Sequence, residues 1–313
     1  MPPSVLVPAH ITGFFYPLLD SPDPLRQGSL GAGVSLQMGM RTEAEFLEGE
    51  QGSVEVWING EQVEEAPVSR RVGELLLLWS RKSGKLVLRH EAYAPIGAGF
   101  GMSGAAALGA ALAGARALGL ALRPLQLAQL AHLVEVEQRT GLGTVIAEYY
   151  GGLELRLRPG APGIGQLIKL KLAEPYYVLA SYNGPMSTRA LLSSQEVLSE
   201  VRALAPSLLA RLLREPSAEL FMRLSHEFSL ALTGVPGAVK EELRRLRQEG
   251  LLMAMAMFGH TYFTLVPESR LDEERRRASQ LIAGRRLYLA RVDEEGLEGR
   301  LLYEDPAQPS QGR

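Results

Sequence analysis

The sequence predicts an α+β protein, and its 313 residues suit one large domain or two lobes. Two observations favour this class. Short runs of alternating apolar and polar residues, typical of strands, recur in the first third of the chain, where Asn59-Gly60 has the composition of a two-residue hairpin turn. Longer stretches with apolar residues at helical spacing follow, and strand-like runs return before the end.

Composition argues against several classes of function. The formal net charge is −2, and the basic runs at 244–247 and 275–277 are mixed with Glu, so we expect no nucleic-acid partner. The chain has no cysteine, which excludes disulfides, thiolate metal sites and a cysteine nucleophile. The first residues lack a basic segment followed by a long apolar core, so we expect a cytoplasmic protein.

An uncharged stretch, 92–115, is long enough to cross a bilayer. It consists mostly of Gly and Ala, and Pro95 and a cluster of glycines interrupt its first third. We therefore expect neither a membrane span nor a membrane partner.

In the first half, the strands expected are 4–8, which ends at a proline, 53–58 with its return after the hairpin turn, and 86–93. A Gly-rich segment, 27–39, lies between the first two. The apolar run 75–79 is too short to assign to a helix or a strand. The elements expected next are helices at 103–122 and 124–138, a short apolar or helical run after 140–144, and a strand at 153–158.

The Pro- and Gly-rich stretch 159–166 is either a linker or a long hairpin loop. Beyond it, the expected elements are a strand at 176–182, helices from about Arg189 to 250, a strand–turn–strand unit at 254–267, a charged helix at 270–283 and a final strand at 287–293. Helix breaks are expected at Pro206, Pro216 and 234–237. The residues after Glu304 have a disordered composition.

The most informative stretch is PIGAGFGMSGAAALGAALA, 95–113. A strand, a Gly-rich loop and a long helix in this order are typical of a phosphate-binding loop. Glycine lets backbone N–H groups converge on one point, and a helix N-terminus carries about half a positive charge. Ser103 stands at the predicted helix start, where it can cap the helix or reach a metal ion on the phosphates.

Two common nucleotide motifs fit this loop poorly. No Lys follows the glycines, so the Walker A pattern is absent. Gly99, Gly101 and Gly104 match the dinucleotide fingerprint badly, and no acidic residue stands about twenty positions on. A tightly packed helix of small residues without a ligand remains the alternative.

The stretch PIGAGFGMSGAA resembles the second motif of the GHMP small-molecule kinases, P-x-x-x-G-L-x-S-S-A. Pro95, Gly99, Phe100 and Ser103 match in type and spacing, whereas Met102 and Gly104 replace a Ser and an Ala. VPAHITG lies where the family opens with A-P-G-K or A-P-G-R, and AMFGHTYFTL lies where it has a C-terminal glycine loop. HITGFF, GSLGAGVSL, TGLGTVIAEYYGGLELR and GPMSTRALL resemble the archaeal pantoate kinase branch.

The resemblance implies a two-lobe α+β fold. Residues 1–170 would form an ATP-binding lobe like ribosomal protein S5 domain 2, and 171–304 a ferredoxin-like lobe, followed by a tail at 305–313. The implied reaction is Mg²⁺- and ATP-dependent phosphorylation of the primary hydroxyl of (R)-pantoate in archaeal coenzyme A biosynthesis. A homodimer is left open.

Within this resemblance, the residues expected to bind ATP are Pro95, Gly97, Ala98, Gly99, Gly101, Met102, Ser103 and Gly104. Ser103 and Glu135 match the Ser and Glu with which the family holds Mg²⁺, a cation that prefers oxygen ligands. Glu135 lies between apolar neighbours, although a helix-face carboxylate is the alternative. Glu137 is its rival, two residues on.

The expected catalytic residues are His10, Ser103, Glu135 and Thr144. Many GHMP kinases carry an Asp seven residues before the Gly-Gly pair, but Thr144 stands there, so the resemblance assigns no general base. Glu148 is near in sequence but in another register. His10 occupies the Lys or Arg position of the family, and we expect it to orient the substrate hydroxyl or contact the γ-phosphate.

Pantoate is a small anion, so its carboxylate needs a donor. The candidates are Arg26, beside Gly28-Ser29, and a predicted helix start, whose N–H groups favour an anion. The alternatives are a surface Arg and an ordinary N-cap. The expected substrate residues are His10, Thr12, Arg26, Ser29, Ser187, Thr188 and Arg189.

Two other functions stay open. One is a GHMP kinase for another hydroxyl substrate, such as homoserine or mevalonate. The other is a kinase-like binding protein without turnover, which Thr144 in place of Asp motivates.

Overall fold

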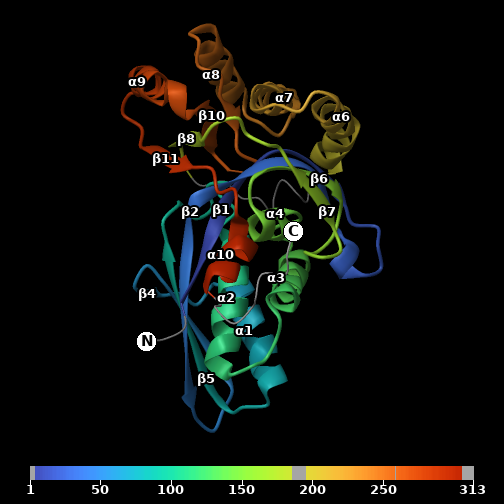
Figure 1. Ribbon diagram of the computed structural model, residues 1–313, viewed down its shortest axis with the longest axis vertical. Helices are drawn as coiled ribbons and strands as arrows, with labels where there is room; N and C mark the ends of the chain where they lie inside the picture. The colour runs from blue at the N-terminus through green and yellow to red at the C-terminus, as the bar shows by residue number, and fades with distance from the viewer. Residues whose placement is uncertain (1–3, 185–194, 258, 305–313) are drawn as a thin grey trace.

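The computed structural model describes residues 4–184, 195–257 and 259–304. Two lobes, each with its own sheet, are stacked along the long axis of the molecule (Figure 1). The two-lobe α+β class predicted from the sequence is confirmed. Among the described residues, no helix is both long and apolar enough to cross a membrane.

A long antiparallel pair of strands, β1 (Ser4–Leu18) and β2 (Gly28–Glu48), runs through the first lobe. The short 3-10 helix η1 (Pro24–Arg26) lies in the connection between them. On its other edge, β2 pairs with β5 (Gly84–Ala92) along its second half and with β6 (Leu153–Arg158) along its first half. The remaining strands of this sheet are β3 (Ser53–Ile58), β4 (Glu61–Gln62) and β7 (Gln166–Lys169).

The predicted end of the first strand at Pro8 is wrong, because β1 continues to Leu18. A register shift between Pro8 and Ala9 accommodates the proline, which has no N–H for the ladder. The Gly-rich segment 27–39 is also mainly strand. A Cβ added at Gly33 would lie 2.3 Å from Nε2 of His10, so this glycine leaves room for a side chain from the neighbouring strand.

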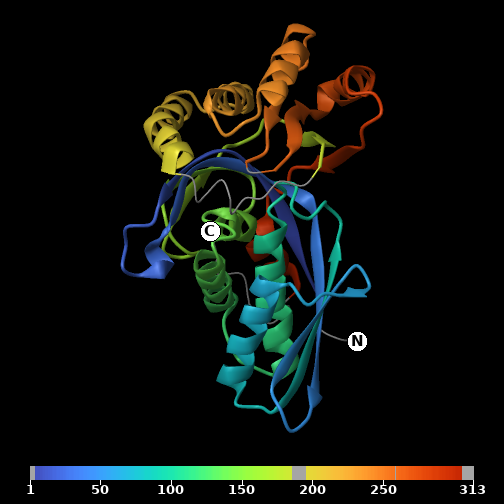
Figure 2. The same cartoon turned by 180° about the vertical axis from the view of Figure 1, so that it is seen from behind.

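Three helices cover one face of the first sheet (Figure 2). They are α1 (Pro67–Ser80), α2 (Met102–Leu118) and α3 (Pro124–Gln138). The unassigned run 75–79 belongs to α1. The second helix ends four residues before its predicted end, because Gly119 adopts a left-handed conformation with φ 67° and stops it. The short helix α4 (Thr144–Tyr150) then leads to β6, and 159–166 is a hairpin loop rather than a linker.

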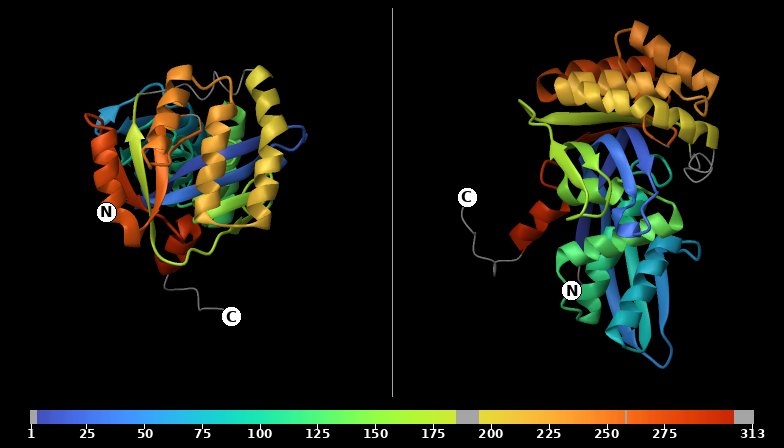
Figure 3. Two further views of the ribbon diagram at one scale, coloured as in Figure 1. Left: turned by 90° about the horizontal axis from the view of Figure 1, so that it is seen from above. Right: turned by 90° about the vertical axis from the view of Figure 1, so that its right-hand side faces the viewer.

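The second lobe has a sheet in the order β11-β8-β10-β9. Its strands are β8 (Tyr176–Tyr182), β9 (Ala254–Met255), β10 (Thr261–Pro267) and β11 (Leu287–Arg291). Four helices cover one face of this sheet (Figure 3). They are α6 (Gln195–Arg214), α7 (Ala218–Ala231), α8 (Gly237–Gln248) and α9 (Leu271–Leu281), the last preceded by the 3-10 helix η2 (Glu268–Arg270). Two of them, α6 and α7, also contact β1 of the first lobe.

Two features of this lobe differ from prediction. Pro206 lies inside α6 instead of breaking it, because apolar residues on both sides of it, including Val201 and Leu208, are buried in the core. An additional helix, α10 (Gly296–Glu304), follows β11 and packs against α4 of the first lobe. Asp293 starts it by accepting hydrogen bonds from the N–H groups of Glu295 and Gly296 at 3.1 Å each.

The two lobes meet along β1. The rings of Phe14 and Phe15 lie 6.3 and 6.2 Å from that of Phe228 on α7. The N–H of Met257 donates to the carbonyl of Thr12 at 3.1 Å. The same strand therefore borders the second lobe and carries His10 and Thr12.

We expect Gly109→Ala to destabilise the fold by about 1–3 kcal/mol, as overpacking does. Its Cβ would lie 2.1 Å from Oγ1 of Thr42, which is buried and bonded to His90 at 2.8 Å. The control is Gly237→Ala at the start of α8, where the added Cβ would meet no atom within 4 Å. This substitution should change the free energy of unfolding by no more than about 0.5 kcal/mol. Urea unfolding measures both, and equal stability of the two variants would contradict the close packing of α2 on β2.

Candidate active site

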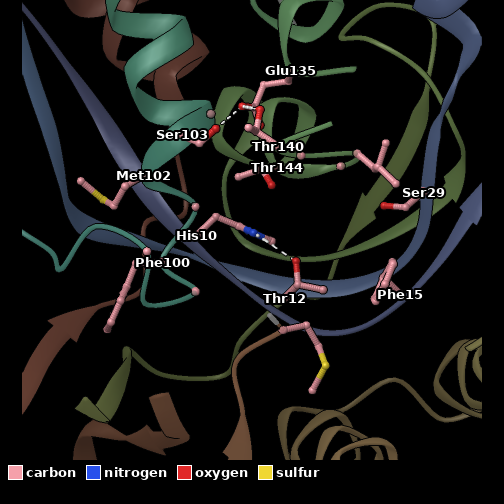
Figure 4. Close-up of a pocket in the computed structure, with 18 residues that line it drawn as sticks. His10, Thr12, Phe15, Ser29, Phe100, Met102, Ser103, Glu135, Thr140 and Thr144 are labelled. Carbon is pink, nitrogen blue, oxygen red and sulfur yellow. Dashed lines mark hydrogen bonds between the residues drawn. The ribbon is translucent and has the colours of Figure 1, made fainter. Parts of the chain in front are cut away.

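One pocket gathers most of the residues predicted to act. It lies where β1, the glycine loop before α2, the end of α3 and the start of α4 converge, with Met257 from the second lobe (Figure 4). The predicted residues that line it are His10, Thr12, Ser29, Gly97, Gly99, Gly101, Met102, Ser103, Gly104, Glu135 and Thr144. The lining residues not predicted to act are Phe15, Phe100, Thr140, Gly141, Leu142, Gly143 and Met257.

The other predicted residues lie elsewhere. Pro95 and Ala98 belong to the glycine loop but do not line the pocket. The Arg26 side chain is 68% exposed and pairs with Asp23 at 3.5 Å, outside the pocket lining. Ser187, Thr188, Arg189 and the predicted helix start there lie outside the described residues.

The glycine loop needs its glycines for both conformation and space. Gly97, Gly99 and Gly101 have φ of 74°, 87° and 69°, a region that other residues rarely adopt. A Cβ at Gly99 would come within 3.1 Å of Gly259 in the second lobe. Phe100 fixes the loop on both sides, since its carbonyl accepts the N–H of His10 at 3.0 Å and its ring packs 5.9 Å from that of Tyr288. The loop thus presents the N-terminus of α2 to the pocket.

Glu135 is the central carboxylate of the pocket. It comes from α3, is only 2% exposed, and its Oε1 accepts hydrogen bonds from the hydroxyls of Ser103 and Thr140, the latter at 2.6 Å. Burial raises the pKa of Glu135, and the two hydroxyl donors oppose this rise. Glu137, the rival, is 39% exposed and pairs with Arg71 at 3.5 Å.

The residues around Glu135 suit a magnesium ion. Its Oε2 is buried without a hydrogen-bond partner among the described residues, and a Cβ at Gly141 would lie 2.0 Å from it. With the Ser103 hydroxyl, it offers hard oxygen ligands at a helix N-terminus suited to phosphates. In the described part of the chain, no group of three or more His, Cys, Asp or Glu could hold a metal. Phosphate oxygens and water would therefore complete the coordination.

Comparison with known proteins agrees with this geometry. Residues 70–152 match the family model described as GHMP kinases N terminal domain. The chain is 38% identical over 283 residues to a pantoate kinase from Thermococcus kodakarensis, covering 88% of this chain and 90% of that protein. The chain belongs to the GHMP kinase family.

This GHMP kinase is also similar to a second pantoate kinase and to two solved structures. A pantoate kinase from Methanocaldococcus jannaschii is 27% identical, covering 86% of this chain and 94% of that one. A solved structure, "Phosphotransferase related to CoA biosynthesis pathway", has a TM-score of 0.83 at 33% identity, over 94% of this chain and 96% of that one. A homoserine kinase from Cytophaga hutchinsonii, with a TM-score of 0.67 at 16% identity over 94% and 95% of the two chains, shares the fold.

A second buried carboxylate, Glu148, lies beneath the glycine loop of the GHMP kinase. It follows Thr144 by about one turn of α4. Cβ atoms at Gly101 and Gly104 would lie 2.6 and 2.8 Å from its oxygens, so these glycines make room for it. Glu148 is fully buried, and neither oxygen has a hydrogen-bond partner among the described residues. Burial, and then the charge of Glu135, raise its pKa well above the ordinary value.

A third cluster stands behind His10. Nε2 of His10 lies 3.1 Å from Oε1 of Glu154, which also pairs with Arg156. All three side chains are at most 1% exposed. A Cβ atom added at Gly143 would lie 2.4 Å from Oγ of Ser29 and 2.8 Å from Nε of Arg156. Arg156 is thus a buried cation behind a pocket wall that contains no Lys or Arg among its described lining residues.

Sequence reasoning set Glu148 aside and missed Glu154, Arg156 and Thr140. A signal did exist for two of them, because Glu154 and Arg156 are charges in a predicted strand, LELRLR, of which residues 153–156 are buried on both faces. Such charges are rare in a buried strand unless they are paired.

We expect the free energy of unfolding of Glu148→Gln to rise relative to that of the wild type as the pH increases from 4.5 to 8. The folded protein holds the Glu148 proton more tightly than the unfolded chain, whose carboxyl titrates near 4.5. The contribution of this proton to stability is complete below that value and is lost as the pH rises through the folded pKa, with a limiting slope of about 1.4 kcal/mol per pH unit.

Urea unfolding at several pH values measures this difference. Glu137→Gln, at an exposed position, is the control and should show no such trend. A stability difference between Glu148→Gln and the wild type that is independent of pH would contradict a raised pKa for this carboxyl group.

Proposed function

We propose that this GHMP kinase transfers the γ-phosphoryl group of ATP to the primary hydroxyl of (R)-pantoate, giving 4-phosphopantoate on the archaeal route to coenzyme A. The observation that carries the proposal is its similarity to a pantoate kinase at 38% identity, which extends over 88% of the chain and so includes both lobes. The Ser103–Glu135 pair at the N-terminus of α2 agrees with a kinase.

Each part of the pocket has a role in this proposal. The glycine loop and the N-terminus of α2 bind the triphosphate through backbone N–H groups. Ser103 and Glu135 hold Mg²⁺, which supplies charge neutralisation on the phosphates when it is bound. His10 and Thr12 face the place between the lobes where a hydroxyl can approach the γ-phosphate.

The substrate carboxylate requires positive charge, and Arg156 provides it close to the pocket. Its Nε is buried without a partner among the described residues and lies against the wall formed by Gly143 and Ser29. Ser29 can donate a hydrogen bond from the same wall. Arg189, with Ser187 and Thr188, stays a prediction for this role, as does Arg26.

Three further predictions belong to this proposal. The lobe boundaries are 1–170 for ATP binding and 171–304 for the second lobe, although α10 packs back on α4. The protein works in the cytoplasm, where ATP is available. A homodimer stays open as its assembly.

A substrate panel tests the proposal. Purified protein is given ATP, Mg²⁺ and one of (R)-pantoate, mevalonate, homoserine or galactose, and ADP release is measured. We expect release with pantoate. Preferred turnover of another compound would assign a different GHMP kinase, and no release with any of them would favour the binding protein without turnover.

Glu135→Gln should lower kcat at least about a hundredfold, because removing one stabilising group of a charged transition state costs about 10²–10³. The matched control is Glu137→Gln, two residues on in the same helix, which should keep kcat within about twofold. Initial rates at saturating Mg²⁺ and thermal melting of both variants make the comparison. Equal rates for Glu135→Gln and the wild type would remove Glu135 from the magnesium site.

His10→Ala should lower kcat about a hundredfold or more, the low end for a group that positions or transfers a proton. Thr144→Ala should cost about tenfold or less, equivalent to about 1.4 kcal/mol. The expected difference arises because catalysis here depends on positioning and electrostatics and not on a group at 144. The reverse ranking, in variants that remain folded, would make Thr144 the catalytic position and His10 a structural one.

A further inference from the structure

Three adjacent strands bring His10, Glu154 and Arg156 together. His10 lies on β1, where the register pairs it with Ser35 of β2. Gly33 lies two residues from Ser35 on the same face of β2 and pairs on its other side with Glu154 of β6. Because Gly33 has no side chain, the imidazole crosses over β2 and reaches the carboxylate on the third strand, with Nε2 3.1 Å from Oε1. Arg156 lies two residues along β6, on the same face as Glu154, and pairs with the same carboxylate oxygen.

This arrangement determines which ring nitrogen of His10 carries the proton. The Arg156 guanidinium forms an ion pair with Oε1 of Glu154, and a carboxylate in such a pair can only accept hydrogen bonds. Nε2 of His10 must therefore be the donor to Glu154, and in the neutral ring Nδ1 is then unprotonated.

The free nitrogen faces the pocket. Nδ1 has one neighbour with a hydroxyl, Oγ1 of Thr12, at 3.5 Å (Figure 4). This is the long limit for a hydrogen bond. A substrate hydroxyl can therefore take the place of the Thr12 hydroxyl as the donor to Nδ1.

The alternative proton acceptors near the pocket are less suitable. Glu148 does not line the pocket, and it has no contact with the space that a substrate would fill. Oε1 of Glu135 is occupied by two hydroxyl donors, and its Oε2 belongs to the magnesium site. The charged or titratable groups around His10 are Glu154, which contacts its ring, Arg156, which pairs with Glu154, and Glu135, which lines the same pocket. Glu148 of α4 lies under Gly101 and Gly104 of the glycine loop.

We propose that His10 is the general base of the phosphoryl transfer, with Nδ1 as the proton acceptor, and that Glu154 and Arg156 are the positioning residues that hold it in this tautomer. The hydroxyl O–H bond breaks, its proton moves to Nδ1, and the oxygen forms a bond to the γ-phosphorus. The bond from that phosphorus to the β–γ bridging oxygen breaks, and its electron pair leaves with ADP. The imidazolium, beside the Glu154 carboxylate, then releases the proton to solvent. This inference rests on the proposed kinase function.

The first test needs no turnover. Long-range ¹H–¹⁵N spectra of ¹⁵N-histidine-labelled protein report the tautomer of each of the five histidines, and loss of one signal set in His10→Asn assigns His10. We expect a protonated Nε2 and an unprotonated Nδ1 at pH 8. A ring protonated at Nδ1 alone would overturn the inference.

The second test compares Glu154→Gln with the wild type. The amide keeps the shape but loses the charge, so we expect kcat to fall about tenfold to a hundredfold while KM for ATP stays within about twofold. The acid limb of the kcat–pH profile should move to lower pH, because the His10 imidazolium loses the carboxylate that stabilises it. The matched control is Glu45→Gln on β2, where the ion-pair partner Arg89 is exposed. This variant should leave kcat and the kcat–pH profile unchanged.

Glu154→Gln leaves Arg156 as an unpaired buried charge, which destabilises the fold. A double variant that removes both charges therefore separates an effect on His10 from misfolding. Glu154→Gln/Arg156→Met removes both charges, and in a folded protein it should lose the tautomer preference of His10 and keep the lowered kcat. A wild-type pH profile and tautomer in this folded variant would overturn the inference. Absence of turnover by the wild type with every substrate would instead overturn the proposed function, which the tautomer measurement does not address.

Discussion

The pairing of β1 with β2 is the interaction on which the rest of the molecule depends. The ladder runs from Ser4 and Glu43 at one end to Leu18 and Gly28 at the other, through two register shifts. Its middle carries His10 and Thr12 into the pocket, and its far part places Phe14 and Phe15 against α7. A slip by one residue would turn His10 away from Glu154 and the two rings away from the second lobe. The site and the lobe contact are therefore fixed by the same backbone hydrogen bonds.

Much of the pocket could be predicted from sequence because its key residues belong to local patterns. The glycine loop, Ser103 and the α3 carboxylate stand in or beside segments whose helical or loop character is encoded nearby, and the structure brings them together around one pocket. Glu154 and Arg156 could not be assigned in this way, since their significance depends on their register with β2 and their distance from His10. Such pairings join residues 144 positions apart, and no local periodicity reports them.

The fold, too, could be predicted where the signals are local and not where distant contacts decide. The helix Pro124–Gln138 was predicted to the residue, because its apolar spacing and N-terminal proline are local signals. Pro206 was misjudged because burial of the α6 face outweighs an unfavourable residue within it. The C-terminal helix α10 was missed, since it is short and depends on the Asp293 cap and on α4. Tertiary contacts, which a single sequence does not display, decide both cases.

The return of α10 to the first lobe affects how the protein can come apart. Gly151 and Gly296 approach so closely that a Cβ on Gly151 would lie 2.4 Å from the backbone nitrogen of Gly296, and the N–H of Gly152 donates to the carbonyl of Asp293 at 2.6 Å. The chain thus leaves the first lobe, builds the second and comes back to close over α4. Cutting the chain between the lobes would give two fragments that each lack part of a core. Folding on a ribosome therefore completes the packing around α4, at the edge of the pocket, only after α10 has emerged.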